Sequence, residues 1–113
     1  MKELTNRSAI IVFPKKPFVE WAMLYNESPP EDLEQRLEEN HVYLIECTFG
    51  EEIVDVLESY YIRIFEYELL SWNTYKNEWP QNRVYETFIE WFDVSLCDEI
   101  VDLETEKIIS EKL

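Results

Sequence analysis

Residues 51–72 form a run of 22 positions without glycine or proline, a length that fits a helix far better than a strand. Apolar side chains cover most of the circumference of this predicted helix. The polar positions form a narrow stripe at helical spacing: Asp55, Glu58, Ser59, Arg63 and Glu66. A surface helix needs an apolar face only somewhat wider than about 100°. We therefore expect residues 51–72 to be the central packing helix, covered on two or more sides, with Thr48 and Glu51 forming a capping box at its start.

Short apolar runs rich in β-branched residues predict the strands. Residues 8–13 (SAIIVF) are apolar without interruption, which is typical of a strand covered on both faces at the centre of a sheet. Residues 41–47 and 94–103 are the second and third predicted strands. The alternation of the third slips between Cys97 and Ile100, which predicts a bulge or an edge position. Residues 107–110 could fold back as a short fourth strand.

Three further helices are predicted around these strands. Residues 18–26 follow Pro17, which suits the first position of a helix. Residues 28–39 begin with Ser-Pro-Pro-Glu, a helix-entry sequence. Residues 83–92 carry apolar positions at helical spacing after Asn82, a candidate cap. The order of elements predicts a single α+β domain over residues 1–113. We expect a small mixed sheet of three or four strands packed by about four helices, in two layers.

Length and composition are those of a globular domain. A chain of 113 residues with 46% hydrophobic residues has enough apolar surface to fold without disulfide bonds or bound metal ions. The first residues lack an apolar signal-peptide core, and no run of 18 apolar residues is present. We therefore expect a cytoplasmic protein. Cys47 and Cys97, 50 positions apart, are expected to be small buried thiols.

The strongest global feature is a net charge of −15, with 25 acidic and 10 basic side chains. The charge is uneven, since residues 31–59 hold ten acidic groups and one basic group. A field of this sign repels phosphates and anionic lipids, so we expect neither nucleic acid nor membrane binding. It favours a basic protein partner. The alternative is that the acidity only keeps an aromatic-rich protein soluble.

Several classes of chemistry are excluded by residue type. Gly50 is the single glycine, which rules out glycine-rich phosphate loops, dinucleotide fingerprints and the nucleophile elbow. His41 is the single histidine, and Cys47 lies too far along the same strand to share a metal with it. We therefore predict no catalytic residue, no metal and no cofactor, and we favour a protein that is not an enzyme. A Cys–His nucleophile pair that uses Cys97 stays open as the alternative.

Aromatic residues supply the first candidate binding residues. Eleven of the 17 aromatic residues fall within residues 60–92. Four of them stand where the central helix gives way to a loop: Tyr67, Trp72, Tyr75 and Trp79. Aromatic side chains beside carboxylates suit Arg and Lys recognition through cation–π contact and ion pairing. Core or loop-anchoring roles are the alternative.

The few basic residues supply the second set of candidate binding residues. Arg83 opens a predicted helix, whose N-terminus already favours an anion. If Arg7 lay near Arg83, the two could bind a small anion. Structural ion pairs with the many carboxylates are the alternative.

Three stretches resemble a family of small uncharacterised bacterial α/β proteins: NRSAIIVFPKKPFVEW, VYLIE, and WPQNRVYETFIEWFDV with the VDL that follows. The resemblance covers most of the chain and implies a small single-domain α/β protein of unassigned function. It brings no recognised catalytic motif, so no functional residue is carried over.

Three hypotheses of function follow from these observations. The preferred one is a non-enzymatic interaction domain that docks a basic partner through an acidic, aromatic-flanked surface. The second is an immunity-type or nucleic-acid-mimic inhibitor of a basic toxin or nuclease. The third is a small-anion or metabolite-binding domain or enzyme that uses Arg7 and Arg83. A homodimer stays open, because so apolar a central helix could be buried between two copies.

Overall fold

The structure is a computed structural model that describes residues 1–25, 31, 35 and 39–113. The elements in chain order are β1 (Lys2–Glu3), β2 (Arg7–Pro14), α1 (Lys16–Leu24), β3 (His41–Glu46), α3 (Ile53–Trp72), the 3-10 helix η1 (Lys76–Glu78), α4 (Tyr85–Trp91), β4 (Phe92–Cys97) and β5 (Val101–Asp102). The chain is thus mixed α and β, as predicted. The helix expected over residues 28–39 lies for the most part outside the described residues.

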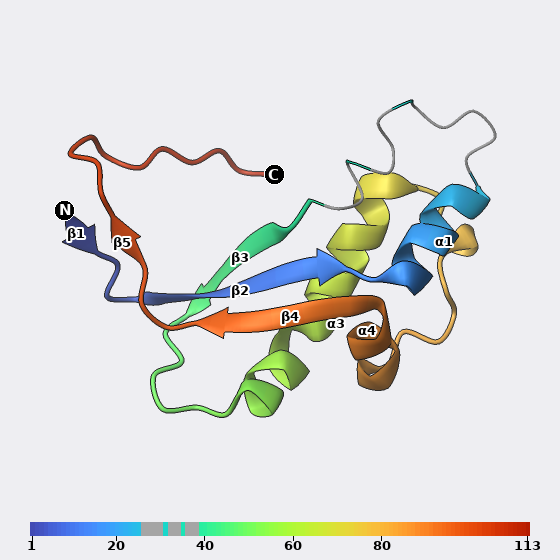
Figure 1. Cartoon of the computed structure of the whole chain (residues 1–113), viewed down its shortest axis with the longest axis horizontal. Coiled ribbons are helices and arrows are strands. Elements are labelled where there is room, and N and C mark those ends of the chain that lie inside the picture. The colour runs from blue at the N-terminus through green and yellow to red at the C-terminus, as the bar shows by residue number, and fades with distance from the viewer. Residues whose placement is uncertain (26–30, 32–34, 36–38) are drawn as a thin grey trace.

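The main sheet has three strands in the order β3-β2-β4 (Figure 1). The central position expected for residues 8–13 is confirmed, since β2 pairs on both sides. The expectation of a mixed sheet is wrong, because both pairings are antiparallel. The reason lies in the connections. The chain leaves β2 and enters β3 at the same end of the sheet, and α3 then carries it back along the sheet so that β4 enters at that end too.

The third predicted strand is broken where its alternation slips. β4 ends at Cys97, and the chain resumes as β5, which pairs with β1 in a separate two-stranded antiparallel ribbon. Figure 1 shows this ribbon at the end of the molecule away from α1. The fourth strand expected at residues 107–110 is not formed. Residues 101–102 pair with β1 near the N-terminus, and not with residues 107–110.

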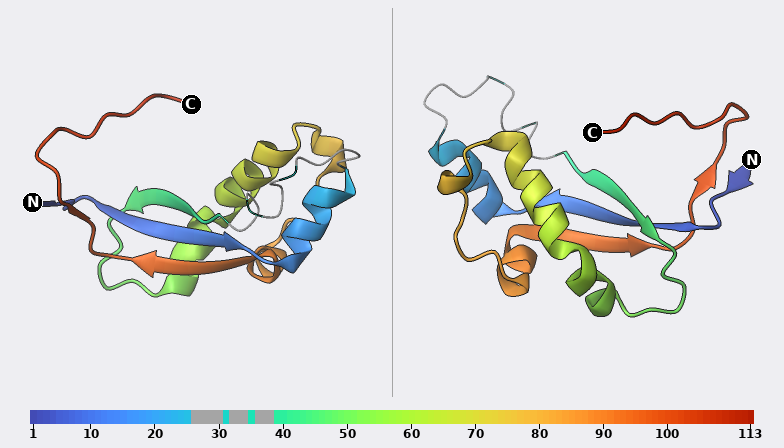
Figure 2. Two further views of the ribbon diagram at one scale, coloured as in Figure 1. Left: turned by 45° about the horizontal axis from the view of Figure 1, so that its top comes forward. Right: turned by 180° about the vertical axis from the view of Figure 1, so that it is seen from behind.

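One face of the main sheet is covered by helices and the other is open. Alternation along β2 turns Ser8, Ile10 and Val12 toward α3, and all three are fully buried. Figure 2 shows α3 crossing this face. On the opposite face Ala9 is buried, whereas Phe13 is 43% exposed. Among the described residues, the expectation that β2 is covered on both faces therefore holds only for part of the strand.

Helix α3 is buried along one face: Val56, Leu57, Ile64, Phe65, Glu68 and Leu69. Apolar residues on its other sides stay exposed, among them Val54 and Leu70 at 49% and 43%. A three-stranded sheet and two shorter helices offer too little surface to surround a helix of 20 residues. Two-sided cover is thus absent among the described residues.

Three phenylalanines join α3, α4 and β4 at the centre of the core. Phe65, Phe88 and Phe92 are buried, and their ring centroids lie 5.3–5.8 Å apart. Phe18 of α1 packs on Phe92 at 5.0 Å. These tilted and edge-on contacts are favourable ring geometries in addition to the area they bury.

A hydrogen-bond network ties the ends of all three strands. Thr48 N–H donates to Ser8 Oγ at 3.0 Å, and Ser8 and Thr48 hydroxyls donate to Asp98 Oδ1 at 3.2 and 2.7 Å. The predicted capping box is therefore wrong, because the Thr48 side chain is engaged elsewhere. The cap of α3 is Glu52, without a side-chain hydrogen bond.

The expected cap of α4 and the expected burial of the two cysteines are also wrong. The cap of α4 is Val84 rather than Asn82, so the helix begins later than predicted. Cys47 is exposed and Cys97 is half-buried, and both are free thiols. Cys47 follows the end of β3, and Cys97 ends an edge strand, where its Sγ donates to the Glu99 carbonyl at 3.1 Å.

We expect Ser8→Ala to lower the free energy of unfolding by about 1–3 kcal/mol, because it leaves the buried Thr48 N–H without its acceptor. Urea denaturation followed by circular dichroism measures this change. Ser95→Ala is the matched control on the exposed face of β4, with an expected effect within about 0.5 kcal/mol. Equal losses in the two variants would contradict a stabilising role for the network.

Candidate functional site

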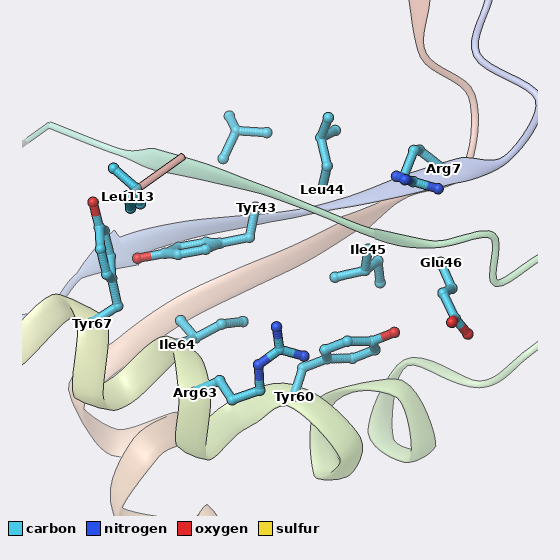
Figure 3. A pocket seen from close by; sticks show the side chains of 11 residues that line it. Arg7, Tyr43, Leu44, Ile45, Glu46, Tyr60, Arg63, Ile64, Tyr67 and Leu113 are labelled. Atoms are coloured by element: carbon cyan, nitrogen blue, oxygen red, sulfur yellow. The ribbon is translucent and has the colours of Figure 1, made fainter. Parts of the chain in front are cut away.

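A cavity of the described residues, the β3–α3 groove, lies between edge strand β3 and helix α3 and measures about 720 Å³ (Figure 3). It is lined by Arg7, Val42, Tyr43, Leu44, Ile45, Glu46, Tyr60, Arg63, Ile64, Tyr67 and Leu113. Tyr43 and Tyr67 meet edge-on with centroids 6.1 Å apart. The Arg63 guanidinium lies 5.9 Å from the centroid of the Tyr60 ring. A cavity of this size with a few convergent polar groups is typical of ligand sites.

Two of the chain's four arginines line this groove, whereas Glu46 is its one acidic lining residue. Arg7 Nη1 donates to the Asn6 carbonyl at 2.9 Å. Within the described part of the chain, neither Arg7 nor Arg63 forms an ion pair. The groove is therefore locally basic on a molecule that is acidic overall.

A buried carboxylate lies beside the groove. Glu68 of α3 is 3% exposed, and a hydrogen bond of 2.7 Å joins its Oε2 to Nδ1 of His41 on β3. Burial raises the pKa of Glu68, although the contact with His41 opposes the rise. Burial and the Glu68 charge raise the pKa of the neighbouring Tyr43 hydroxyl as well. This cluster joins β3 to α3 and contains a buried carboxyl group whose pKa is raised above its ordinary value.

The second cavity, here called the aromatic cavity, measures about 370 Å³ and lies where α1, the end of α3 and η1 meet. It is lined by Trp21, Ala22, Tyr25, Leu70, Ser71, Trp72, Asn73, Thr74, Tyr75 and Glu78. Trp21 Nε1 donates to the Glu78 carbonyl at 2.9 Å, which fixes η1 against α1. Tyr75 is 68% exposed, and its backbone N–H donates to Asn73 Oδ1. The cavity thus combines several aromatic walls with Glu78, whose Oε1 accepts a hydrogen bond of 3.5 Å from Asn73 Nδ2.

Trp79 and Arg83 form a separate unit behind this cavity. Trp79 is 5% exposed, and its Nε1 donates to the Asn73 carbonyl at 2.7 Å. The Arg83 guanidinium lies 5.6 Å from the centroid of the Trp79 ring, and its Nη1 donates to the Pro80 carbonyl at 2.8 Å. Trp79 therefore anchors the loop after α3.

The structure divides the six predicted binding residues among three places. Tyr67 and Arg7 line the β3–α3 groove, and Trp72 and Tyr75 line the aromatic cavity. Trp79 and Arg83 pack on each other and line neither cavity. Arg7 and Arg83 therefore do not share a cavity, which was the condition for the small-anion hypothesis.

Sequence reasoning missed Glu68, Arg63 and Glu78. Glu68 had a usable signal, because position 68 continues the buried stripe of Ile64 and Phe65 at helical spacing. A carboxylate at such a position needs a partner, and His41 is the single imidazole available. Arg63 and Glu78 gave no comparable signal, because each stands at a position where the sequence pattern predicts an exposed polar side chain.

The described residues contain neither a metal-binding cluster of side chains nor a helix that could cross a membrane. No group of three or more His, Cys, Asp or Glu side chains there is arranged to hold a metal ion. None of the helices that the structure describes combines the length and apolar character needed to cross a membrane.

Comparisons with known proteins add no functional information. No family model, curated protein or solved structure matches the chain.

We expect Glu68→Gln to stabilise the fold increasingly as the pH rises. The folded chain holds the Glu68 proton more tightly than the unfolded chain, so wild-type stability falls as the pH rises from the ordinary glutamic acid range through the raised pKa. Glutamine keeps a hydrogen-bonding group for His41 and carries no charge. Urea denaturation between about pH 4 and pH 8 should show a difference in the free energy of unfolding between the variant and the wild type that grows in favour of the variant as the pH rises.

Glu66→Gln is the matched control, because it removes the same charge from an exposed position of α3. Its effect should be nearly independent of pH over the same range. A pH-independent difference between Glu68→Gln and the wild type would contradict the raised pKa.

Proposed function

We propose that this protein is a non-enzymatic interaction domain that docks a basic protein partner at the aromatic cavity. The observation that carries the proposal is the meeting of Trp72, Tyr75 and Glu78 around one cavity. Aromatic faces attract a guanidinium or ammonium group through the ring quadrupole, and an adjacent carboxylate adds an ion pair. An Arg or Lys side chain of the partner is the chemistry that fits these walls.

The charge distribution supports the same partner. Among the described residues, the contacts between a basic side chain and a carboxylate are Lys16–Glu20 and His41–Glu68, so most of the carboxylates that the structure describes have no such partner there. Burial and the charges of Glu58 and Glu86 raise the pKa of Tyr85, which shows how acidic groups of α3 and α4 gather around an aromatic side chain. A surface potential of this kind speeds encounter with a basic protein.

The inhibitor hypothesis uses the same surface and differs only in the partner. A basic toxin or nuclease would be held by the same cation–π and ion-pair contacts, so identification of the partner decides between an adaptor and an inhibitor. Arg7 and Arg83 line no common cavity, which gives the third hypothesis, a small-anion site formed by these two residues, less support.

We expect Tyr75→Ala and Glu78→Gln each to weaken binding of a fluorescent oligo-arginine peptide. Loss of one cation–π or ion-pair contact should cost about 1–2 kcal/mol, or about a 5- to 30-fold rise in Kd. Fluorescence anisotropy at about 0.15 M salt, where long-range attraction is screened, measures the local contacts. Tyr75 is largely exposed, so its loss should leave the fold intact.

Glu90→Gln on the exposed surface of α4 is the control for net charge. It removes the same charge as Glu78→Gln but lines neither cavity. Equal weakening by the two variants would show that the peptide responds to the overall charge and would overturn the proposed docking site.

A further inference from the structure

The outer edge of β3 is unpaired among the described residues. β3 stands at the end of the order β3-β2-β4, and only β2 pairs with it. Val42 and Leu44 on this strand are 60% and 55% exposed. Natural edge strands usually carry charges, proline or a bulge that prevent further pairing. β3 has its polar residues at the two ends, and its middle is an open template for another strand.

The β3–α3 groove has the form of a strand-addition site. Four residues of α3 line it at spacings of three and four along one helix face: Tyr60, Arg63, Ile64 and Tyr67. Figure 3 shows this stripe facing β3. An extended chain beside β3 would complete the backbone hydrogen bonds of the edge and place alternate side chains over the stripe.

Residues 107–113 (KIISEKL) are an extended segment of matching character. Ile108 and Ile109 are 60% and 90% exposed. Within the described part of the chain, no hydrogen bond or ion pair involves residues 106–113. The segment thus exposes apolar side chains and unpaired backbone groups, the same two features as the edge of β3.

The segment already reaches the groove. Leu113 lines the cavity together with Val42 and Tyr43 (Figure 3). Figure 1 shows the chain after β5 turning back and running along β3 in the opposite direction. Addition to β3 would therefore be antiparallel, like the other pairings of this sheet.

One ion pair is available to the same occupant. Among the described residues Arg63 faces the groove without an ion pair, and residues 107–113 contain Glu111 as well as Lys107 and Lys112. In an antiparallel register that sets Leu113 opposite Val42, Glu111 falls near the middle of β3, and Arg63 lies on the α3 side of the groove (Figure 3). A carboxylate there would pair with Arg63.

The geometry points to the β3–α3 groove as a strand-addition site whose occupant is this chain's own segment 107–113. The segment docks antiparallel to β3 as a fourth strand, with Ile109 against the groove and Glu111 beside Arg63, because positions 109, 111 and 113 share one face of a strand. Attachment to the same chain gives the segment a high effective concentration, so it outcompetes a free peptide of the same chemistry. The site is distinct from the aromatic cavity and does not depend on the proposed function.

Hydrogen exchange of the full-length chain, read by mass spectrometry, tests this docking. Ile109→Asp should speed amide exchange in residues 41–46 by at least about tenfold, because the outer edge of β3 loses its partner. Leu103→Asp is the control, since Leu103 is 73% exposed and precedes the segment. Its exchange in β3 should equal that of the wild type. Equal exchange in Ile109→Asp and wild type would overturn the proposal.

Charge reversal tests the predicted pair. Arg63→Glu should speed exchange in β3, and Glu111→Arg in the same chain should restore slow exchange, which a merely structural role of Arg63 would not produce. Failure of the second change to restore protection would overturn the placement of Glu111.

Two further measurements separate this occupant from others. A fluorescent peptide with the sequence of residues 103–113 should bind Ile109→Asp at least about tenfold more tightly than wild type, because the groove has been vacated. Equal binding would overturn the proposal. Light scattering should give a monomer; a dimer that Ile109→Asp abolishes would overturn it in favour of exchange of the segment between two copies.

Discussion

The contact of Phe65, Phe88 and Phe92 is the constraint on which the rest of the molecule depends. These three buried rings come from α3, α4 and β4, and Phe18 extends the cluster to α1. A three-stranded sheet alone could not hold a helix of 20 residues in one orientation. The rings fix where α3 crosses the sheet, and this crossing sets the positions of both cavities along the helix.

The two cavities differ in character because they lie on different parts of α3. The middle of the helix faces β3 with Arg63 and tyrosines, so the groove there is locally basic. The end of the helix meets α1 and η1, where aromatic walls surround Glu78. Helix α3 thus lines two cavities: the β3–α3 groove, which suits an extended strand, and the aromatic cavity, which suits a cationic side chain. Glu68 lies between them as a buried carboxylate whose pKa is raised by its surroundings.

Much of the secondary structure could be predicted because periodicity and chain length encode it locally. The glycine-free run at 51–72 became α3, SAIIVF became the central strand, and the slip after Cys97 marked a break. The capping residues could not be predicted. Thr48 has the right spacing for a capping box, yet its hydroxyl bonds Asp98, which lies 50 residues away in sequence. Such long-range competition leaves no local trace.

The sequence by itself determined the class of the fold, the central strand and helix, the acidity and the set of available aromatic residues. Only the tertiary structure decided the antiparallel sheet, its open face, and the division of the candidate residues between two cavities and a buried loop anchor. The physical reason is that helix and strand periodicities state which side of an element is apolar. They do not state which element covers that side, and this choice brought Trp21 to Glu78 and separated Arg7 from Arg83.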